Sequence, residues 1–279
     1  MLFPLQATAQ WFGDVSVEWQ NTDNLPRAQF KPDQLSDHSL SVALNGGFHI
    51  QTGDYTGLNI TGLLRSSTFN EFTGMSNIET GIGASLSHKF GLGLLAPTLT
   101  VSGQYSRNEF RNSIRDSDNL AFSVSLQKRL TERTSLAAGI GYDLRDGDHD
   151  LRKTATALIP GNAFDSRAIS GFLQSEFDLN EVSWLSASAE LSNGDIVSTG
   201  LPYALITAAT KALTADHVFG PKATAYRIDA RTTLLSIDYN HVVGERGTWY
   251  LGVENQDTRG SADIDYTVQL IRTGFIYGF

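Results

Sequence analysis

The feature of this chain that most constrains its fold is a strict alternation of apolar residues with small or polar ones. Between residues 38 and 50, for example, Leu40, Val42, Leu44, Phe48 and Ile50 share one phase, and serine, alanine, asparagine, glycine and histidine fill the other. Successive side chains of a strand point to opposite faces, so this pattern predicts strands with one apolar and one polar face. Such runs predict about twelve strands, near residues 11–20, 38–50, 55–66, 77–90, 97–107, 119–130, 135–145, 167–179, 183–193, 225–243, 248–256 and 265–279.

The predicted strands are long for a globular protein. At about 3.3 Å per residue, a strand of roughly 10 to 14 residues spans a tilted path through a bilayer, whereas ordinary strands are about half that length. This length predicts strands that cross a membrane rather than strands of a soluble sandwich.

The connections between the predicted strands alternate in length. Short ones occur at Gln51–Asp54, Gly91–Leu95, Thr131–Thr134, Asn180–Val182 and Gly244–Gly247, and long polar ones at 21–37, 67–76, 108–118, 146–166, 194–224 and 257–264. Transmembrane barrels have short periplasmic turns and longer extracellular loops. We therefore expect an all-β fold, a transmembrane up-and-down antiparallel β-barrel of about twelve strands, with both chain ends on the periplasmic side.

Aromatic residues gather near the predicted short turns. Amphipathic rings favour the headgroup level of a bilayer, so these residues are expected to form an interfacial girdle. They are Phe48, Tyr55, Phe90, Phe177, Trp184 and Trp249.

Composition narrows the functional classes. Mean hydropathy is −0.18, and no stretch approaches the roughly 18 apolar residues of a membrane helix, which excludes a helical membrane protein. The net charge of −9 argues against a nucleic-acid partner, which would require a basic face. The absence of cysteine excludes disulfides, thiol catalysis and zinc–thiolate sites.

The first residues suggest a secretory signal. Ala7, Thr8 and Ala9 have the A-x-A form that precedes a signal-peptidase cleavage site. We expect residues 1–9 to be the tail of a signal peptide and residues 10–279 to form the barrel domain.

The last eight residues, RTGFIYGF, continue the strand pattern to the final position. The octet resembles the C-terminal signal by which bacterial outer-membrane β-barrels are recognised by their assembly machinery, and Arg272, Gly274, Tyr277 and Phe279 match it in place. The resemblance implies a location in the outer membrane of a Gram-negative-type bacterium. It also implies outer-membrane lipid, lipopolysaccharide and the barrel-assembly machinery as partners.

Charged residues of both signs fall on the phase expected to face the barrel interior. Unpaired burial costs several kcal/mol, so these charges imply a wet lumen or a networked polar plug. The predicted inward charges are Glu18, Arg65, Glu79, Lys89, Arg129, Asp143, Arg145, Glu176, Glu190, Asp229, Arg231, Asp238, Glu254 and Arg272. The residues expected to set ion selectivity are Glu79, Arg65, Arg129, Asp143, Arg145, Arg231 and Glu254.

Two loop segments are unusually apolar. Residues 201–214 (LPYALITAATKALT) include the one candidate helix, and residues 154–164 (TATALIPGNAF) have a similar character. Either segment could fold into the mouth as a constriction, lie on the outer leaflet or hold a ligand, and simple loop packing is the alternative.

Histidines beside acidic residues are the only candidates for catalysis. His149 and His217 each follow an aspartate in a predicted outer loop, which invites comparison with the omptin proteases. The His-x-Ser pair of the outer-membrane phospholipases is missing, and solvated loop residues are the simpler interpretation.

Alternating carboxylates at Asp146, Asp148 and Asp150 could collect a divalent cation. An EF-hand-like loop would require glycine and an acid where Leu151 and Ala157 stand, so that match fails. We expect no cofactor.

These observations favour a narrow channel for small hydrophilic solutes. Two alternatives stay open: a surface-exposed hydrolase or protease, and a plugged scaffold barrel that binds a partner protein. A barrel fold by itself does not decide among them.

Overall fold

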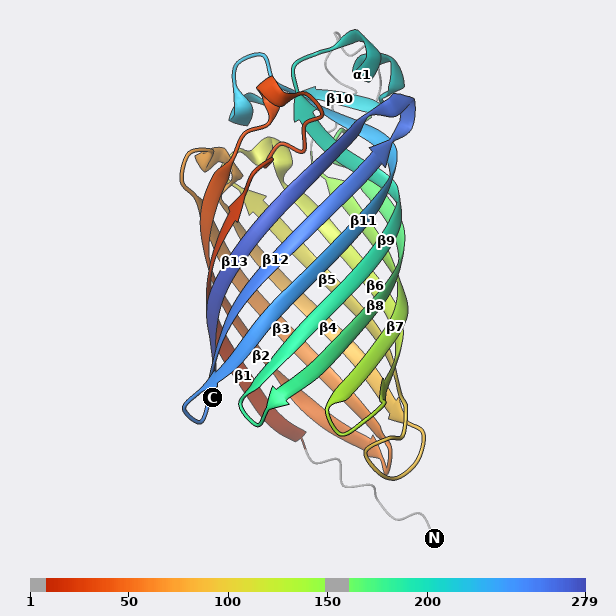
Figure 1. The fold of residues 1–279 in the computed structure, drawn as a ribbon. Helices are drawn as coiled ribbons and strands as arrows, with labels where there is room; N and C mark the ends of the chain where they lie inside the picture. The colour runs from red at the N-terminus through yellow and green to blue at the C-terminus, as the bar shows by residue number, and fades with distance from the viewer. Residues whose placement is uncertain (1–8, 149–160) are drawn as a thin grey trace.

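The computed structural model describes residues 9–148 and 161–279, which form one closed antiparallel β-barrel (Figure 1). The strands are β1 (Ala9–Thr22), β2 (Asp37–Gly53), β3 (Thr56–Phe69), β4 (Asn77–Lys89), β5 (Thr98–Phe110), β6 (Ser117–Arg129), β7 (Thr134–Gly147), β8 (Ser166–Asn180), β9 (Ser183–Gly200), β10 (Ala212–Ala215), β11 (Thr224–Val243), β12 (Gly247–Gly260) and β13 (Asp265–Gly278). Twelve of them form the ring, and the predicted fold and all twelve predicted strands are confirmed. The short β10, which the alternation does not predict, pairs with β11 beyond the point where β12 ends.

Helical structure is confined to the connections. The α-helix is α1 (Ala204–Ala209), and the 3-10 turns are η1 (Lys31–Asp33), η2 (Thr73–Met75), η3 (Ser113–Arg115), η5 (His217–Phe219) and η6 (Ser261–Asp263). Within the described parts of the chain, no helix is both long and apolar enough to cross a membrane.

The first and last strands close the ring. β1 pairs with β13 from Asp14 opposite Gly278 to Thr22 opposite Leu270, and β1 also pairs with β2 along its whole length. At the end of the seam, the Phe279 N–H donates to the Gly13 carbonyl at 2.9 Å. Because every strand of the ring has two neighbours, its backbone groups are paired within the sheet, which a hydrocarbon environment requires.

The two ends of the barrel differ. One, the turn end, carries the connections 54–55, 90–97, 130–133, 181–182 and 244–246, and β1 begins and β13 ends there (Figure 1). The other, the loop end, carries 23–36, 70–76, 111–116, 148–165, 201–223 and 261–264. The predicted alternation in length holds except at two connections. The turn-end connection 90–97 is longer than the loop-end connections 70–76 and 111–116, and the strands β12 and β13 extend far enough to leave only residues 261–264 between them.

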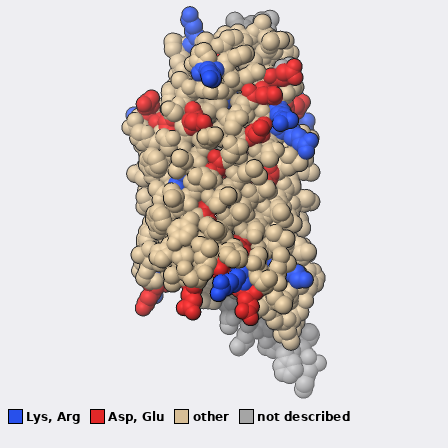
Figure 2. Space-filling model, in the orientation of Figure 1, with Lys and Arg blue, Asp and Glu red and all other residues tan. Residues whose placement is uncertain are grey.

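The outer wall is apolar over its central part. Ile82, Ile140 and Val253 are 59%, 61% and 52% exposed, and most Lys, Arg, Asp and Glu visible in Figure 2 gather toward the two ends. A soluble monomer rarely exposes an apolar surface of this extent, so the wall faces lipid.

Exposed aromatic side chains occur near the turn end. Among the predicted girdle residues, Tyr55, Phe90, Phe177 and Trp249 are exposed. The prediction is wrong for Trp184, which lies opposite Asp178 and Asn240 on the inner phase. Trp184 and the inward-facing Glu190 are six residues apart on β9, whose pairing with β11 runs without a shift from Ser183 to Gly200, so both side chains lie on the same phase.

The surroundings of the adjacent glycines Gly46 and Gly47 predict that the two positions differ in their tolerance of a larger residue. A Cβ at Gly47 would collide with the Ile60 carbonyl oxygen and come within 3.0 Å of the Phe12 ring, whereas the nearest atom to a Cβ at Gly46 is 3.9 Å away. We expect Gly47→Ala to lower the free energy of unfolding by about 1–3 kcal/mol and Gly46→Ala to have little effect. Urea unfolding of the barrel in lipid vesicles measures both, and equal effects of the two substitutions would contradict this packing.

Candidate functional site

The inner wall consists mainly of small and hydroxylated side chains. Serines meet across neighbouring strands, with Ser41–Ser67 at 2.8 Å and Ser102–Ser123 at 2.7 Å between hydroxyl oxygens. These residues alternate with the lipid-facing apolar side chains, so strand phase alone places a polar surface inside the barrel.

Six of the seven residues predicted to set selectivity lie on this inner phase. They are Arg65, Glu79, Arg129, Asp143, Arg145 and Glu254. Their side chains alternate along each strand with exposed apolar residues such as Leu64, Ile78 and Val253.

Arg231 does not face the lumen, and its prediction is wrong. It shares its phase with Leu235 and Ile237, which are 50% and 56% exposed on the outer wall, and it lies opposite Arg259 of β12. Asp229 has the same outward phase. β11 extends 20 residues, so its loop end carries charge on the outer face.

Ion pairs connect the inner wall across strands. Arg65 lies 3.7 Å from Glu79, and Arg272 lies 2.9 Å from Asp238 and 3.9 Å from Glu254. The Arg65 side chain is 49% exposed although it points inward. An inward guanidinium with this exposure indicates space for water inside the barrel.

Two carboxylates lie in a cavity of about 380 Å³ that is lined only by strand residues and therefore lies between the two ends. Asp143 comes from β7 and Glu190 from β9, with Ser170 of β8 between them. Among the described residues, no ion pair joins either carboxylate to a basic side chain.

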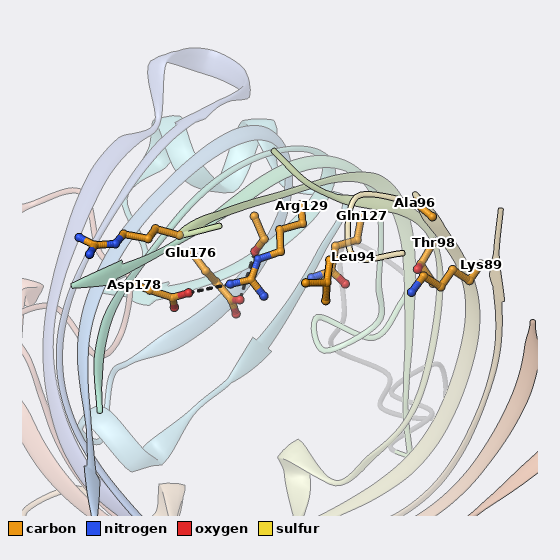
Figure 3. A pocket seen from close by; sticks show the side chains of 10 residues that line it. Lys89, Leu94, Ala96, Thr98, Gln127, Arg129, Glu176 and Asp178 are labelled. Atoms are coloured by element: carbon orange, nitrogen blue, oxygen red, sulfur yellow. Dashed lines mark hydrogen bonds and ion pairs between the residues drawn. The ribbon is translucent and has the colours of Figure 1, made fainter. Parts of the chain in front are cut away.

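The turn end holds a second charged cavity, of about 250 Å³ (Figure 3). Arg129 donates to Asp178 at 3.0 Å and lies between the carboxylates on one side and Leu94 and Lys89 on the other. Leu94 belongs to the β4–β5 turn, so this turn contributes an apolar side chain to the opening.

Loops cover the loop end, and we call this covering the roof (residues 23–36, 70–76, 111–116, 161–165, 201–223 and 261–264). The β1–β2 loop crosses to β9, where the Thr199 N–H donates to the Pro26 carbonyl at 2.8 Å and the Ser198 hydroxyl donates to the Arg27 carbonyl at 2.7 Å. Phe72 and Phe219, from two other loops, meet with ring centroids 5.1 Å apart. The roof is therefore one packed unit.

The segment 201–214 belongs to this roof. Only Ala204–Ala209 is helical, and residues 212–215 form β10 instead. Ile206 of α1 packs with Tyr226, Ile228 and Ile264 in a buried cluster at the loop end, where Figure 1 shows α1 above the barrel. Of the segment 154–164, residues 154–160 lie outside the described residues, and Ala163 and Phe164 are fully buried in the roof.

A buried ion pair locks two roof loops together. The Arg115 guanidinium donates to Asp216, whose side chain is fully buried, and stacks near Phe164 and Phe219 at 5.0 and 5.3 Å from the ring centroids. Thr199 also donates to Asp216 at 3.2 Å. Sequence reasoning missed this pair because its partners come from unrelated loops.

The weak catalytic candidates do not form a site in the described region. Asp216 is engaged by Arg115, and no hydrogen bond in the described part of the chain joins His217 to a carboxylate. His149 lies outside the described residues.

The candidate metal ligands Asp146 and Asp148 lie at the loop end of the outer wall, and Asp150 lies outside the described residues. Arg107 donates to Asp148 at 2.5 Å. The described residues contain no cluster of three or more potential metal ligands.

The terminal residues predicted to form the assembly signal divide between the two faces. Arg272 points inward to Asp238, and Gly274 lies beneath the Tyr250 ring, where a Cβ would collide. Tyr277 and Phe279 are 44% and 64% exposed on the outer face.

No family model matches this chain, and no curated protein matches its sequence. The fold is similar to that of an outer membrane channel from Pseudomonas putida F1, with a TM-score of 0.62 at 11% identity over 100% of this chain and 97% of that one. It is also similar to the NanC porin, with a TM-score of 0.50 at 10% identity over 94% of this chain and 98% of that one. The chain thus has the fold of outer-membrane β-barrel channels.

The buried ion pair between Arg115 and Asp216 predicts a marked effect when one of the two partners is removed. Arg115→Met leaves Asp216 buried without its cation, which typically costs about 3–5 kcal/mol, so we expect the roof loops to be cut much faster by proteinase K. Replacing both partners (Arg115→Met with Asp216→Leu) should restore much of the protection.

The exposed pair Arg259–Asp257, 3.7 Å apart, provides the control, because Arg259→Met should leave protection unchanged. Equal digestion of the Arg115→Met variant and the unmodified protein would show that the pair does not hold the roof.

Proposed function

We propose that this protein is a narrow channel for small hydrophilic solutes in the outer membrane of a Gram-negative-type bacterium. The observation that carries the proposal is the half-exposed side chain of Arg65 inside the barrel, on a wall of hydroxyl and charged groups. A dry core would exclude such a group from water at a cost of several kcal/mol.

The dimensions of the interior favour small solutes. Cavities of about 250, 380 and 220 Å³ occur at the turn end, between the ends and beneath the roof. Twelve strands place this barrel between the filled eight-stranded barrels and the wide porins. The fold shared with solved outer-membrane channels supports the same conclusion.

The position of α1 favours the channel over a plugged scaffold. Ile206 packs against Ile264 of the roof and against Tyr226 and Ile228 at the loop end of β11, and the cavity that contains Asp143 and Glu190 is lined by strands alone. We infer that the roof restricts access from outside and that the strand-lined part of the lumen stays hydrated.

Lipid partners follow from the outer surface. The lipid-facing phase near the loop end carries Arg167 and Arg231. Guanidinium groups bind phosphate bidentately, so we propose that this rim contacts lipopolysaccharide. We also propose that the barrel-assembly machinery recognises Arg272, Gly274, Tyr277 and Phe279.

Single-channel recording in planar bilayers tests the channel. We expect discrete conductance steps in KCl, and the variants Arg65→Gln and Arg129→Gln should shift the reversal potential in a salt gradient toward greater cation selectivity. Arg231→Gln removes the same charge from the outer face and should leave the reversal potential unchanged. A folded barrel that passes no current would refute the channel.

Deleting Phe279 tests the assembly proposal. The deletion removes the ring over Gly13 and the hydrogen bond at the end of the seam. We expect less heat-modifiable barrel in cells, while protein refolded into detergent still forms the barrel. Unchanged assembly in cells would count against recognition of the terminal residues.

A further inference from the structure

The cavity of about 220 Å³ beneath the roof is strongly cationic for a protein of net charge −9. Three arginines line it: Arg27 from the β1–β2 loop, Arg115 from η3 and Arg145 from β7. Among the described residues that line it, Glu254 is the one carboxylate, and Arg272 lies 3.9 Å from it.

Arg145 is held by neutral partners. Its Nε donates to the Ser117 hydroxyl at 3.0 Å, and its Nη2 donates to the Arg115 carbonyl at 2.8 Å. The Phe110 and Phe164 ring centroids lie 5.8 and 5.9 Å from its guanidinium carbon. These contacts fix the orientation of the guanidinium without neutralising its charge.

Arg27 reaches the cavity through an unusual backbone conformation. Its φ is 58°, in the left-handed region that side-chain-bearing residues rarely adopt. The conformation is held by the hydrogen bonds from Thr199 to Pro26 and from Ser198 to the Arg27 carbonyl. The side chain remains exposed, and within the described chain no carboxylate is hydrogen-bonded to it. Strain of this kind is commonly retained where it positions a functional group.

The three cations repel one another. Arg27 and Arg115 both act on Arg145 as like charges, Asp165 offsets part of this repulsion, and of the three arginines only Arg115 has a bonded carboxylate, that of Asp216. An anion bound between Arg27 and Arg145 would relieve this repulsion. Guanidinium forks match the planar, two-oxygen geometry of a carboxylate.

The remaining residues that line the cavity indicate the chemical character of the part of the ligand that is not the carboxylate. Leu25, Met75, Phe110, Val268 and Leu270 are apolar, and Thr22 and Gln256 add polar groups. A hydrated inorganic anion would gain little from this apolar surface, whereas an organic acid would bury its hydrocarbon part there.

We propose that this cavity is a binding station for small organic carboxylates, with Arg27 and Arg145 as the carboxylate-binding residues and Arg115 as the residue that positions Arg145. The proposal deepens the proposed function, because a station beneath the roof selects which solutes enter the lumen.

Ligand binding to the purified full-length barrel in detergent tests the station directly, without conductance. Saturation-transfer NMR should detect benzoate, with much weaker signals from the neutral isostere benzamide. Inorganic phosphate, which has no observable proton, is added as a competitor and should displace benzoate only weakly. Arg27→Ala and Arg145→Gln should each weaken benzoate binding about tenfold or more, and Arg27→Lys should recover part of the affinity. Arg231→Gln is the matched control and should bind as the unmodified protein does.

Heat-modifiability on a gel shows whether each variant is folded. Because the Arg27 side chain is exposed, Arg27→Ala leaves the contacts of Arg145 with the roof in place. Equal binding of benzamide and benzoate, or unchanged affinity in the folded Arg27→Ala variant, would overturn the proposal. Tighter binding of phosphate than of benzoate would overturn the assignment to organic acids.

Current block separates this inference from the proposed function. Benzoate added on the loop side should reduce the KCl current, and Arg27→Ala should relieve the block. If the barrel conducts but neither binds benzoate nor is blocked by it, the station fails and the channel stands. If it binds benzoate but passes no current, the channel fails and the station stands.

Discussion

Pairing of the backbone in a medium without water is the constraint on which this structure depends. An amide or carbonyl left unpaired in hydrocarbon costs several kcal/mol, so a sheet can cross a bilayer only if its first strand finds its last. Here β1 and β13 meet along the seam from Asp14–Gly278 to Thr22–Leu270. Strand length, strand number and the tight turns all serve this closure.

Closure also determines the chemistry of the interior. The register of a strand decides which face of the sheet each side chain points to. All polar residues on the inward phase therefore face the lumen together. The lumen therefore receives charges whose partners come from neighbouring strands, as Arg272 does with Asp238 and Glu254. Because these groups are solvated or paired, the interior tolerates carboxylates such as Asp143 and Glu190 that a packed core would not.

Sequence periodicity was sufficient to predict the ring of strands, but not the structure at the loop end of the barrel. The alternation of inward and outward side chains continues along a strand for about 10 or more residues. Within the hydrocarbon region, the apolar side chains are the ones that face the lipid. At Arg231 the rule that charge faces inward fails, because the strand there has passed the apolar belt, although Leu235 and Ile237 already mark its phase.

The roof follows a different logic. The contacts of Arg115 with Asp216, and of Arg27 with β9, join residues from unrelated loops, and no periodicity encodes them. The left-handed φ of Arg27 has no marker either, since glycine or asparagine is the usual residue in that region. The candidate station was therefore accessible only from the three-dimensional arrangement.

The interlocked roof has an evolutionary consequence. Surface loops of a barrel usually vary independently, since each is anchored only by its own hairpin. Here the β1–β2 loop rests on β9, and Phe72 and Arg115 both contact the β9–β11 connection, so a length change in one loop disturbs several others. Immune or phage pressure on this surface would therefore select coordinated changes across loops rather than free drift in any one of them.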